Sequence, residues 1–202
     1  MVSATTIPDG FNVKLRPEYL RGMSAEEFFR FCQDNPKLRL ERDAKGEIIF
    51  ISPSGFQSSN LSHEIAYELE SWNRVHKYGK ATDSNGGFTL PNGAIRAADV
   101  ALVSFARLKN LPQEELKKFP AVTPNFIVEV ISPSDSLADQ QAKMDEWIQN
   151  GVELGWLICP QTEQVWIYEP SKATVHHTGF DRSLSGELAL PGFTFDLKLL
   201  RG

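Results

Sequence analysis

The sequence predicts an α/β protein with a mixed central β-sheet flanked by helices. Two apolar, strand-like runs occupy residues 96–103 and 125–132. The second run is followed by a helical pattern and then by another strand at 154–159, which is the order of a β-α-β unit. A second amphipathic helix precedes both runs. Helices that alternate with strands in this way are typical of a layered α/β fold.

A helix and a hairpin are expected at the N-terminal side of this core. Ser24 and Glu27 have the spacing of a capping box, which predicts a short helix that runs to about Asp34. The segments Leu38–Arg42 and Glu47–Ile51 flank a turn-rich tetrapeptide, Asp-Ala-Lys-Gly. That arrangement predicts a β-hairpin.

The first core helix is predicted over Asn60–Lys77, with Gly79 as its stop signal. Glu64 and Glu68 border its apolar face. Its apolar residues recur at steps of three and four, as an amphipathic helix requires: Leu61, Ile65, Leu69, Trp72 and Val75.

The middle of the chain predicts strands at Phe88–Leu90 and Arg96–Val103, then a charged helical connection over Pro112–Lys118. A further strand spans Asn125–Ser132. Pro133 ends that strand, and the next three residues, Ser-Asp-Ser, supply N-cap candidates for a helix that reaches Asn150.

Gly151 suits the position after that helix. Four more strands are expected beyond it: Leu154–Cys159, Gln164–Tyr168, Thr174–His177 and Glu187–Leu190.

Length and composition indicate one domain over residues 1–202, with 1–20 and 195–202 at its periphery. The chain is 41% hydrophobic and 23% charged, and its apolar runs are too short to cross a bilayer, so a membrane protein is excluded. Residues 1–10 lack the pattern of a secretory signal, which leaves the cytoplasm as the expected location. Cys32 and Cys159 are far apart and form no metal or redox motif.

The formal net charge of −5 argues against a protein that coats nucleic acid through bulk electrostatics. Any contact with nucleic acid must therefore be local. The best local candidate is a basic group at the end of the first core helix, made of Arg74, His76, Lys77 and Lys80. Complementation of the helix dipole by cations explains the same residues, and these residues alone favour that explanation.

Two carboxylates lie inside the apolar runs and are the main candidates for chemistry. Asp99 follows Ala98 in one run, and Glu129 shares a strand face with Ile127 and Ile131 in the other. Buried carboxylates need a compensating cation, and two of them from neighbouring strands would give Mg²⁺ or Mn²⁺ two oxygen ligands. The alternative is a structural network, such as an ion pair with Arg96.

Lys143 is the third candidate. The core positions of its helix are Leu137, Met144 and Ile148, which places Lys143 at the margin of the buried face. Its long stem can reach the carboxylates and hold the attacking water of a phosphodiester hydrolysis. The alternative is a surface pair with Asp139, four residues earlier.

With these residues, the chain resembles the PD-(D/E)xK nuclease superfamily and, within it, the Uma-two family of restriction endonucleases, also called domain of unknown function 820. The resemblance covers most of the chain. The matching segments are Ser52-Pro53-Ser54 with His63, Ala98-Asp99-Val100, Val128 to Ser134, Lys143, Gly151-Val152-Glu153 and Trp156 to Pro160.

The resemblance implies a restriction-endonuclease-like sheet in which Asp99, Glu129 and the main-chain carbonyl of Val130 bind a divalent cation. Glu64 would be an extra acid from the first core helix, and whether Glu64 or Glu68 is this auxiliary acid is left open. Lys143 looks like the family's migrated lysine, since Ile131 occupies the position where the superfamily usually has one.

Two positions depart from the family pattern. Ala98 stands where the superfamily has Pro, and Gly155 stands where an aromatic residue often precedes Trp156. Neither change removes a chemical group. The second alters packing beside Trp156.

The sequence therefore supports a Mg²⁺- or Mn²⁺-dependent endonuclease that hydrolyses DNA. Two alternatives stay open: a catalytically inactive nuclease-fold module that serves as a binding or structural subunit, and a metal-dependent hydrolase of smaller phosphate substrates. Metal binding by the folded chain would favour an enzyme over the inactive module, and the width of the cleft separates the third hypothesis. DNA is the implied partner, and whether two chains pair as a homodimer is left open.

Overall fold

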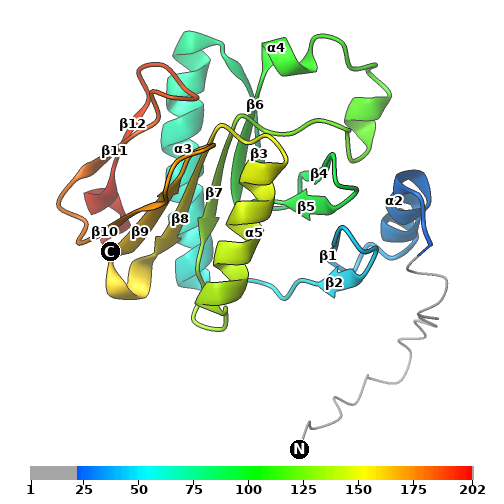
Figure 1. Cartoon of the computed structure of the whole chain (residues 1–202), viewed down its shortest axis with the longest axis horizontal. Coiled ribbons are helices and arrows are strands. Elements are labelled where there is room, and N and C mark those ends of the chain that lie inside the picture. Colours follow the sequence, from blue (N-terminus) through cyan, green and yellow to red (C-terminus); the bar gives the residue numbers. More distant parts are fainter. Residues whose placement is uncertain (1–21, 202) are drawn as a thin grey trace, which may run out of the picture.

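A six-stranded mixed sheet forms the centre of the computed structural model, which describes residues 22–201 (Figure 1). Its strand order is β10-β9-β8-β7-β6-β3. β7 and β8 are parallel, and the other neighbours are antiparallel. The strands span Gly79–Asp83 (β3), Val100–Ser104 (β6), Phe126–Val130 (β7), Leu154–Cys159 (β8), Gln164–Tyr168 (β9) and Val175–Thr178 (β10). This arrangement confirms the predicted fold class.

Helices α3 (Phe56–His76) and α5 (Leu137–Gln149) cover opposite faces of this sheet. Strand residues alternate between the two faces, so Val128 and Val130 face the core below α3, whereas Ile127 faces the core below α5. Trp147 of α5 is fully buried in that second core. Helix α5 ends as predicted, with Gly151 at a φ of 102° after it. Leu137, by contrast, is exposed rather than a core residue.

A smaller four-stranded sheet lies beside the central one, in the order β2-β1-β5-β4 (Figure 1). It contains the predicted hairpin, and helix α2 with its predicted capping box precedes it. The bounds of these elements are Ala25–Asp34 (α2), Leu40–Arg42 (β1), Ile48–Phe50 (β2), Gly87–Thr89 (β4) and Ile95–Ala97 (β5).

The predicted strand Arg96–Val103 is wrong in one respect that matters for the site. It is two strands, β5 and β6, which belong to different sheets and are separated by a bend at Ala98 and Asp99. The apolar pattern is continuous across this bend because Ala98 is itself fully buried. The chain therefore carries Asp99 at the junction of the two sheets.

Helix α3 also differs from its prediction. It begins at Phe56, four residues early, and ends at His76; the next residue, Lys77, is its C-cap and adopts a left-handed φ of 50°. Gly79 instead lies in β3, a strand that the sequence pattern did not predict. A Cβ atom at Gly79 would lie 2.1 Å from the main-chain oxygen of Val103, so the close pairing of β3 with β6 needs glycine.

The C-terminal region differs most. Residues 187–190 form turns rather than a strand, between β11 (Ser183–Ser185) and β12 (Thr194–Asp196). The expected peripheral position of 195–202 is wrong for the described part, since Phe195 and Leu197 are buried in the core. The expectation for residues 1–20 lies outside the described residues.

The remaining elements are short. The predicted helical connection over Pro112–Lys118 contains only the 3-10 turn η1. The turns are α4 (Phe105–Leu108), η1 (Glu115–Lys117), η2 (Pro160–Thr162) and η3 (Leu197–Leu200). Within residues 22–201, none of the helices combines the length and the apolar character that a bilayer crossing needs.

Candidate active site

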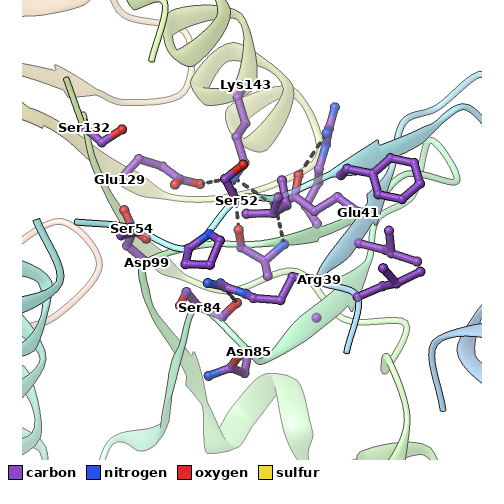
Figure 2. A pocket seen from close by; sticks show the side chains of 18 of the residues that line it. Arg39, Glu41, Ser52, Ser54, Ser84, Asn85, Asp99, Glu129, Ser132 and Lys143 are labelled. Carbon is purple, nitrogen blue, oxygen red and sulfur yellow. Dashed lines mark hydrogen bonds and ion pairs between the residues drawn. The ribbon is translucent and has the colours of Figure 1, made fainter. Parts of the chain in front are cut away.

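A cavity of about 790 Å³ lies between the small sheet, the end of β7 and the first half of α5. Asp99, Glu129, Val130 and Lys143 all line it. Figure 2 shows Glu129 and Lys143 pointing toward each other, with Asp99 next to them. The parallel strand β7 ends here, and the carboxyl ends of parallel strands are where open α/β sheets usually bind ligands.

Asp99 owes its position to the bend between β5 and β6. Its Oδ2 accepts a hydrogen bond of 2.8 Å from the main-chain N–H of Val130, at the end of β7. Burial raises the pKa of Asp99 above its usual value, although the Val130 N–H and the charge of Lys143 oppose the rise. The main chain of β7 thus holds the Asp99 carboxyl group next to the strand that carries Glu129.

Glu129 is 5% exposed and lies on the face of β7 that α5 covers. Its Oε1 accepts a hydrogen bond of 3.1 Å from Nε1 of Trp147 and lies 2.9 Å from Nζ of Lys143. Burial raises the pKa of Glu129 to about 7; Lys143 opposes this rise, and the charges of Asp99 and Glu41 add to it. Asp99 and Glu129 are therefore close enough to repel each other.

Lys143 uses all three of its donors. Nζ lies 2.9 Å from Glu129, 3.0 Å from Oε1 of Glu41 and 3.0 Å from the main-chain oxygen of Ala97. Burial by itself would lower the pKa of Lys143, but Glu129 and Glu41 outweigh it and raise the pKa. Lys143 is therefore an ammonium ion at neutral pH, so it can donate hydrogen bonds but cannot accept a proton.

The close approach of α5 to the sheet brings Lys143 into the site. Met144, the next residue, packs over Gly155 of β8, where a Cβ atom would lie 2.6 Å from Cε of Met144. Glycine at position 155, where the family often has an aromatic residue, is thus matched by the Met144 side chain that packs against it. The absence of a side chain at Gly155 leaves room for Met144 of α5 next to the site.

Glu41 is a site residue that the sequence reasoning missed, and Arg96, which it named only as a structural partner of the acids, lies beside Glu41. Glu41 of β1 is 5% exposed and bridges Lys143 to Arg96, whose Nη1 lies 3.0 Å from Glu41 Oε2. Arg96 also pairs with Glu146 at 2.6 Å. The only signal for Glu41 in the sequence was a charged residue within the predicted strand Leu38–Arg42.

The two structural alternatives named the wrong partners, although Glu129 does lie in a buried network of ion pairs and hydrogen bonds. Within the described chain, Arg96 pairs with Glu41 and Glu146 and forms no ion pair with Asp99 or Glu129. Lys143 pairs with Glu41 and Glu129, not with Asp139. The lysine and Glu129 are thus joined directly.

The donor set fits a hard divalent cation. The ionisable side chains around Lys143 carry an excess of two negative charges when all are ionised. They are four carboxylates, of Glu41, Asp99, Glu129 and Glu146, and two cations, of Arg96 and Lys143. In the described part of the chain, three or more acidic, histidine or cysteine side chains do not gather closely enough to hold a metal by themselves. Mg²⁺ commonly takes only one or two carboxylates, with water and phosphate oxygens completing its shell.

Two other predicted groups lie elsewhere. Glu64 of α3 is partly buried but does not line the cavity. Arg74 pairs with Glu70, and the basic group around it lies at the C-terminal end of α3, whereas Ser54 and Gly55 at the other end line the cavity. The 21 residues of α3 separate these two ends by about 30 Å.

Comparison with solved structures supports the fold. The chain is similar to a structure described as "a putative nuclease belonging to DUF820 from Anabaena variabilis", with a TM-score of 0.72 and 17% identity. The match covers 88% of this chain and 97% of the other. A search of curated proteins found no match. The family profile Uma2, described as "Putative restriction endonuclease", matches residues 25–198, and the chain therefore belongs to the Uma2 family.

Proposed function

We propose that the protein is a divalent-metal-dependent endonuclease that hydrolyses DNA phosphodiester bonds. The observation that carries this proposal is the pair Asp99 and Glu129, which line the same cavity. Glu129 is buried, Asp99 is partly buried, and the pKa values of both carboxyl groups are raised. Lys143 offsets only one of these two negative charges, so a bound cation would stabilise the pair further. Acids with raised pKa values in a cavity are typical of functional sites. The family description supports the nuclease class.

Asp99, Glu129 and the main-chain carbonyl of Val130 would hold Mg²⁺ or Mn²⁺. When bound, such an ion offsets the charge that develops on the phosphate and makes a water molecule nucleophilic near neutral pH. Asp99 is already fixed for this role by the Val130 N–H, and Glu129 is fixed by Trp147. Both carboxylates therefore present their remaining oxygen atoms from a rigid scaffold.

Lys143 would donate a hydrogen bond to the attacking water or to a phosphate oxygen. Because its three donors are all used, one of its contacts to Glu129, Glu41 or Ala97 must open for this. Glu41 keeps the ammonium in the site while this happens. An auxiliary role for Glu64 stays a prediction, since this residue does not line the cavity.

The experiment is a cleavage assay with Mg²⁺ on a supercoiled plasmid and on circular single-stranded DNA. Wild type is expected to open at least one of the two circles, and Asp99→Asn and Glu129→Gln are expected to lose the activity. Opening of the circles without added metal and in EDTA would contradict the proposal. Failure of wild type to bind metal would favour the inactive module, and hydrolysis confined to small phosphate esters would favour the third hypothesis.

A further inference from the structure

The cavity has a second wall that the metal chemistry does not use. Opposite Lys143 lie Arg39, which precedes β1, and Ser84 (Figure 2). A smaller cavity of about 240 Å³ adjoins the main one, and the residues that line both are Arg39, Pro53, Ser54, Ser84 and Asp99. Ser59 and Ser62 of α3 complete its lining.

Arg39 differs from the other two cations that line the cavity. Arg96 and Lys143 each contact two carboxylates. Arg39 donates one hydrogen bond, of 3.1 Å, to the main-chain oxygen of Ser84. Among residues 22–201 it has no carboxylate within ion-pair distance, although its charge acts on Asp99 and lowers the pKa of that carboxyl group. Its guanidinium carries five N–H donors, so most of them are available to a ligand.

The chemistry of this subsite suits a phosphate group. A guanidinium binds phosphate oxygens through paired, charge-assisted hydrogen bonds, and serine hydroxyls add further donors. The subsite also adjoins Asp99, so a phosphate bound there would lie next to the reacting one along a nucleic-acid backbone.

An exposed aromatic ring lies on the same cavity. Phe50, at the end of the edge strand β2, lines the cavity and is 53% exposed. A large apolar side chain in this position contributes little to the core. An aromatic ring beside a cationic groove is the arrangement with which proteins stack the bases of an unpaired strand.

The cavity has too few unpaired cations to bind the backbone of a DNA duplex. Proteins that grip duplex DNA by its backbone commonly neutralise several phosphates, whereas this cavity offers one cation without a carboxylate partner among the described residues. The net charge of −5 adds repulsion. A volume of about 790 Å³ is typical of a pocket for a small ligand, such as one or two nucleotides.

We infer that the cavity takes a single, unpaired DNA strand: Arg39 and the serines hold the phosphate that neighbours the reacting one, and Phe50 stacks on a base. This inference deepens the proposed function and rests on it for the identity of the reacting group. It assigns to Arg39 a role in binding substrate, separate from the metal ligands.

The test is a binding measurement that needs no cleavage. Full-length Glu129→Gln protein, in EDTA, is titrated into a fluorescently labelled DNA strand of about 12 nucleotides, and into the matching duplex. The strand is expected to bind at least about tenfold more tightly than the duplex. The logarithm of its association constant should fall with the logarithm of salt concentration with a slope near −0.7, the value for about one phosphate contact on a single strand.

Matched variants in the same background locate the contact. Arg39→Gln is expected to weaken strand binding about tenfold, the loss of one charge-assisted hydrogen-bonding group. Lys45→Gln removes the same charge from the exposed hairpin turn, outside the cavity, and should change binding less than about twofold. Phe50→Ala should weaken binding about fivefold or more, and Phe50→Leu controls for loss of apolar bulk.

Duplex binding as tight as strand binding, or equal effects of Arg39→Gln and Lys45→Gln, would overturn the inference. Circular dichroism of each variant confirms that the chain is folded. Because binding is measured without metal, a failure of the nuclease proposal and a failure of this inference are distinguishable. Mn²⁺ binding by the single variant Arg39→Gln should stay within about threefold of wild type, since Arg39 is not a metal ligand.

Discussion

Replacing Glu129 by Gln should stabilise the metal-free protein at alkaline pH while it destroys the metal site. The folded protein holds the Glu129 carboxyl at a pKa of about 7, against an ordinary value of 4.5. Each pKa unit corresponds to about 1.4 kcal/mol, so ionising this group in the fold costs about 3 kcal/mol relative to the unfolded chain. A neutral side chain of the same shape avoids that cost.

The direction with pH follows from the protons bound in each state. Between pH 4.5 and about 7 the unfolded carboxyl has lost its proton while the folded one still keeps it, so the Glu129 contribution to stability falls as the pH rises. Below this window both states are protonated. The advantage of Glu129→Gln should therefore be near zero around pH 4.5 and reach up to about 3 kcal/mol at pH 8.

The substitution leaves no buried charge without a partner. Lys143 keeps Glu41 at 3.0 Å, and the Gln side-chain oxygen can still accept the hydrogen bond from Trp147. That is why the usual penalty for breaking a buried ion pair does not apply here. Urea unfolding in EDTA between pH 4.5 and 8 measures the difference. A Glu129→Gln protein that is less stable than wild type at pH 8, or a difference independent of pH, would refute this reasoning.

Three further predictions follow from the same contacts. Lys143→Met leaves Glu41 and Glu129 facing each other without their shared cation, so it should lower the unfolding free energy by about 3–5 kcal/mol at pH 8 and abolish DNA cleavage. Urea titrations measure the stability, and an unchanged value would contradict the buried network. Because Trp147 stabilises the ionised form of Glu129, Trp147→Phe should shift the pH midpoint of Mn²⁺ binding, expected near 7 in wild type, to a higher value by calorimetry. Gly155→Ala crowds Met144 and should cost about 1–3 kcal/mol on thermal unfolding, with a loss of cleavage that Met144→Ala in the same chain partly restores.

The sequence predicts the central elements because local signals specify them. The caps of α2 and α5 are side chains adjacent to the helix ends, and the structure confirms both. The alternation in β7 correctly places Glu129 on the same face as Ile127, below α5. These signals need no knowledge of distant residues.

The rest depends on contacts between distant segments. Glu41 joins the site because the hairpin docks against α5, which brings together residues 102 positions apart. The break between β5 and β6 is hidden by the buried Ala98, and β3 forms because Gly79 tolerates close contact with β6. In the sequence, Arg39 is an arginine within a predicted strand, and only the folded cavity shows that it lies opposite Lys143. None of these features has a periodic or capping signal.

Calorimetric titration of Mn²⁺ into metal-free wild-type protein and Asp99→Asn tests whether the two carboxylates form a metal site. We expect one ion per wild-type chain at pH 8, with binding lost in an Asp99→Asn protein that retains its fold. Wild-type protein that binds no ion, or an Asp99→Asn protein that binds it with unchanged affinity, would contradict the assignment of Asp99 and Glu129 as metal ligands.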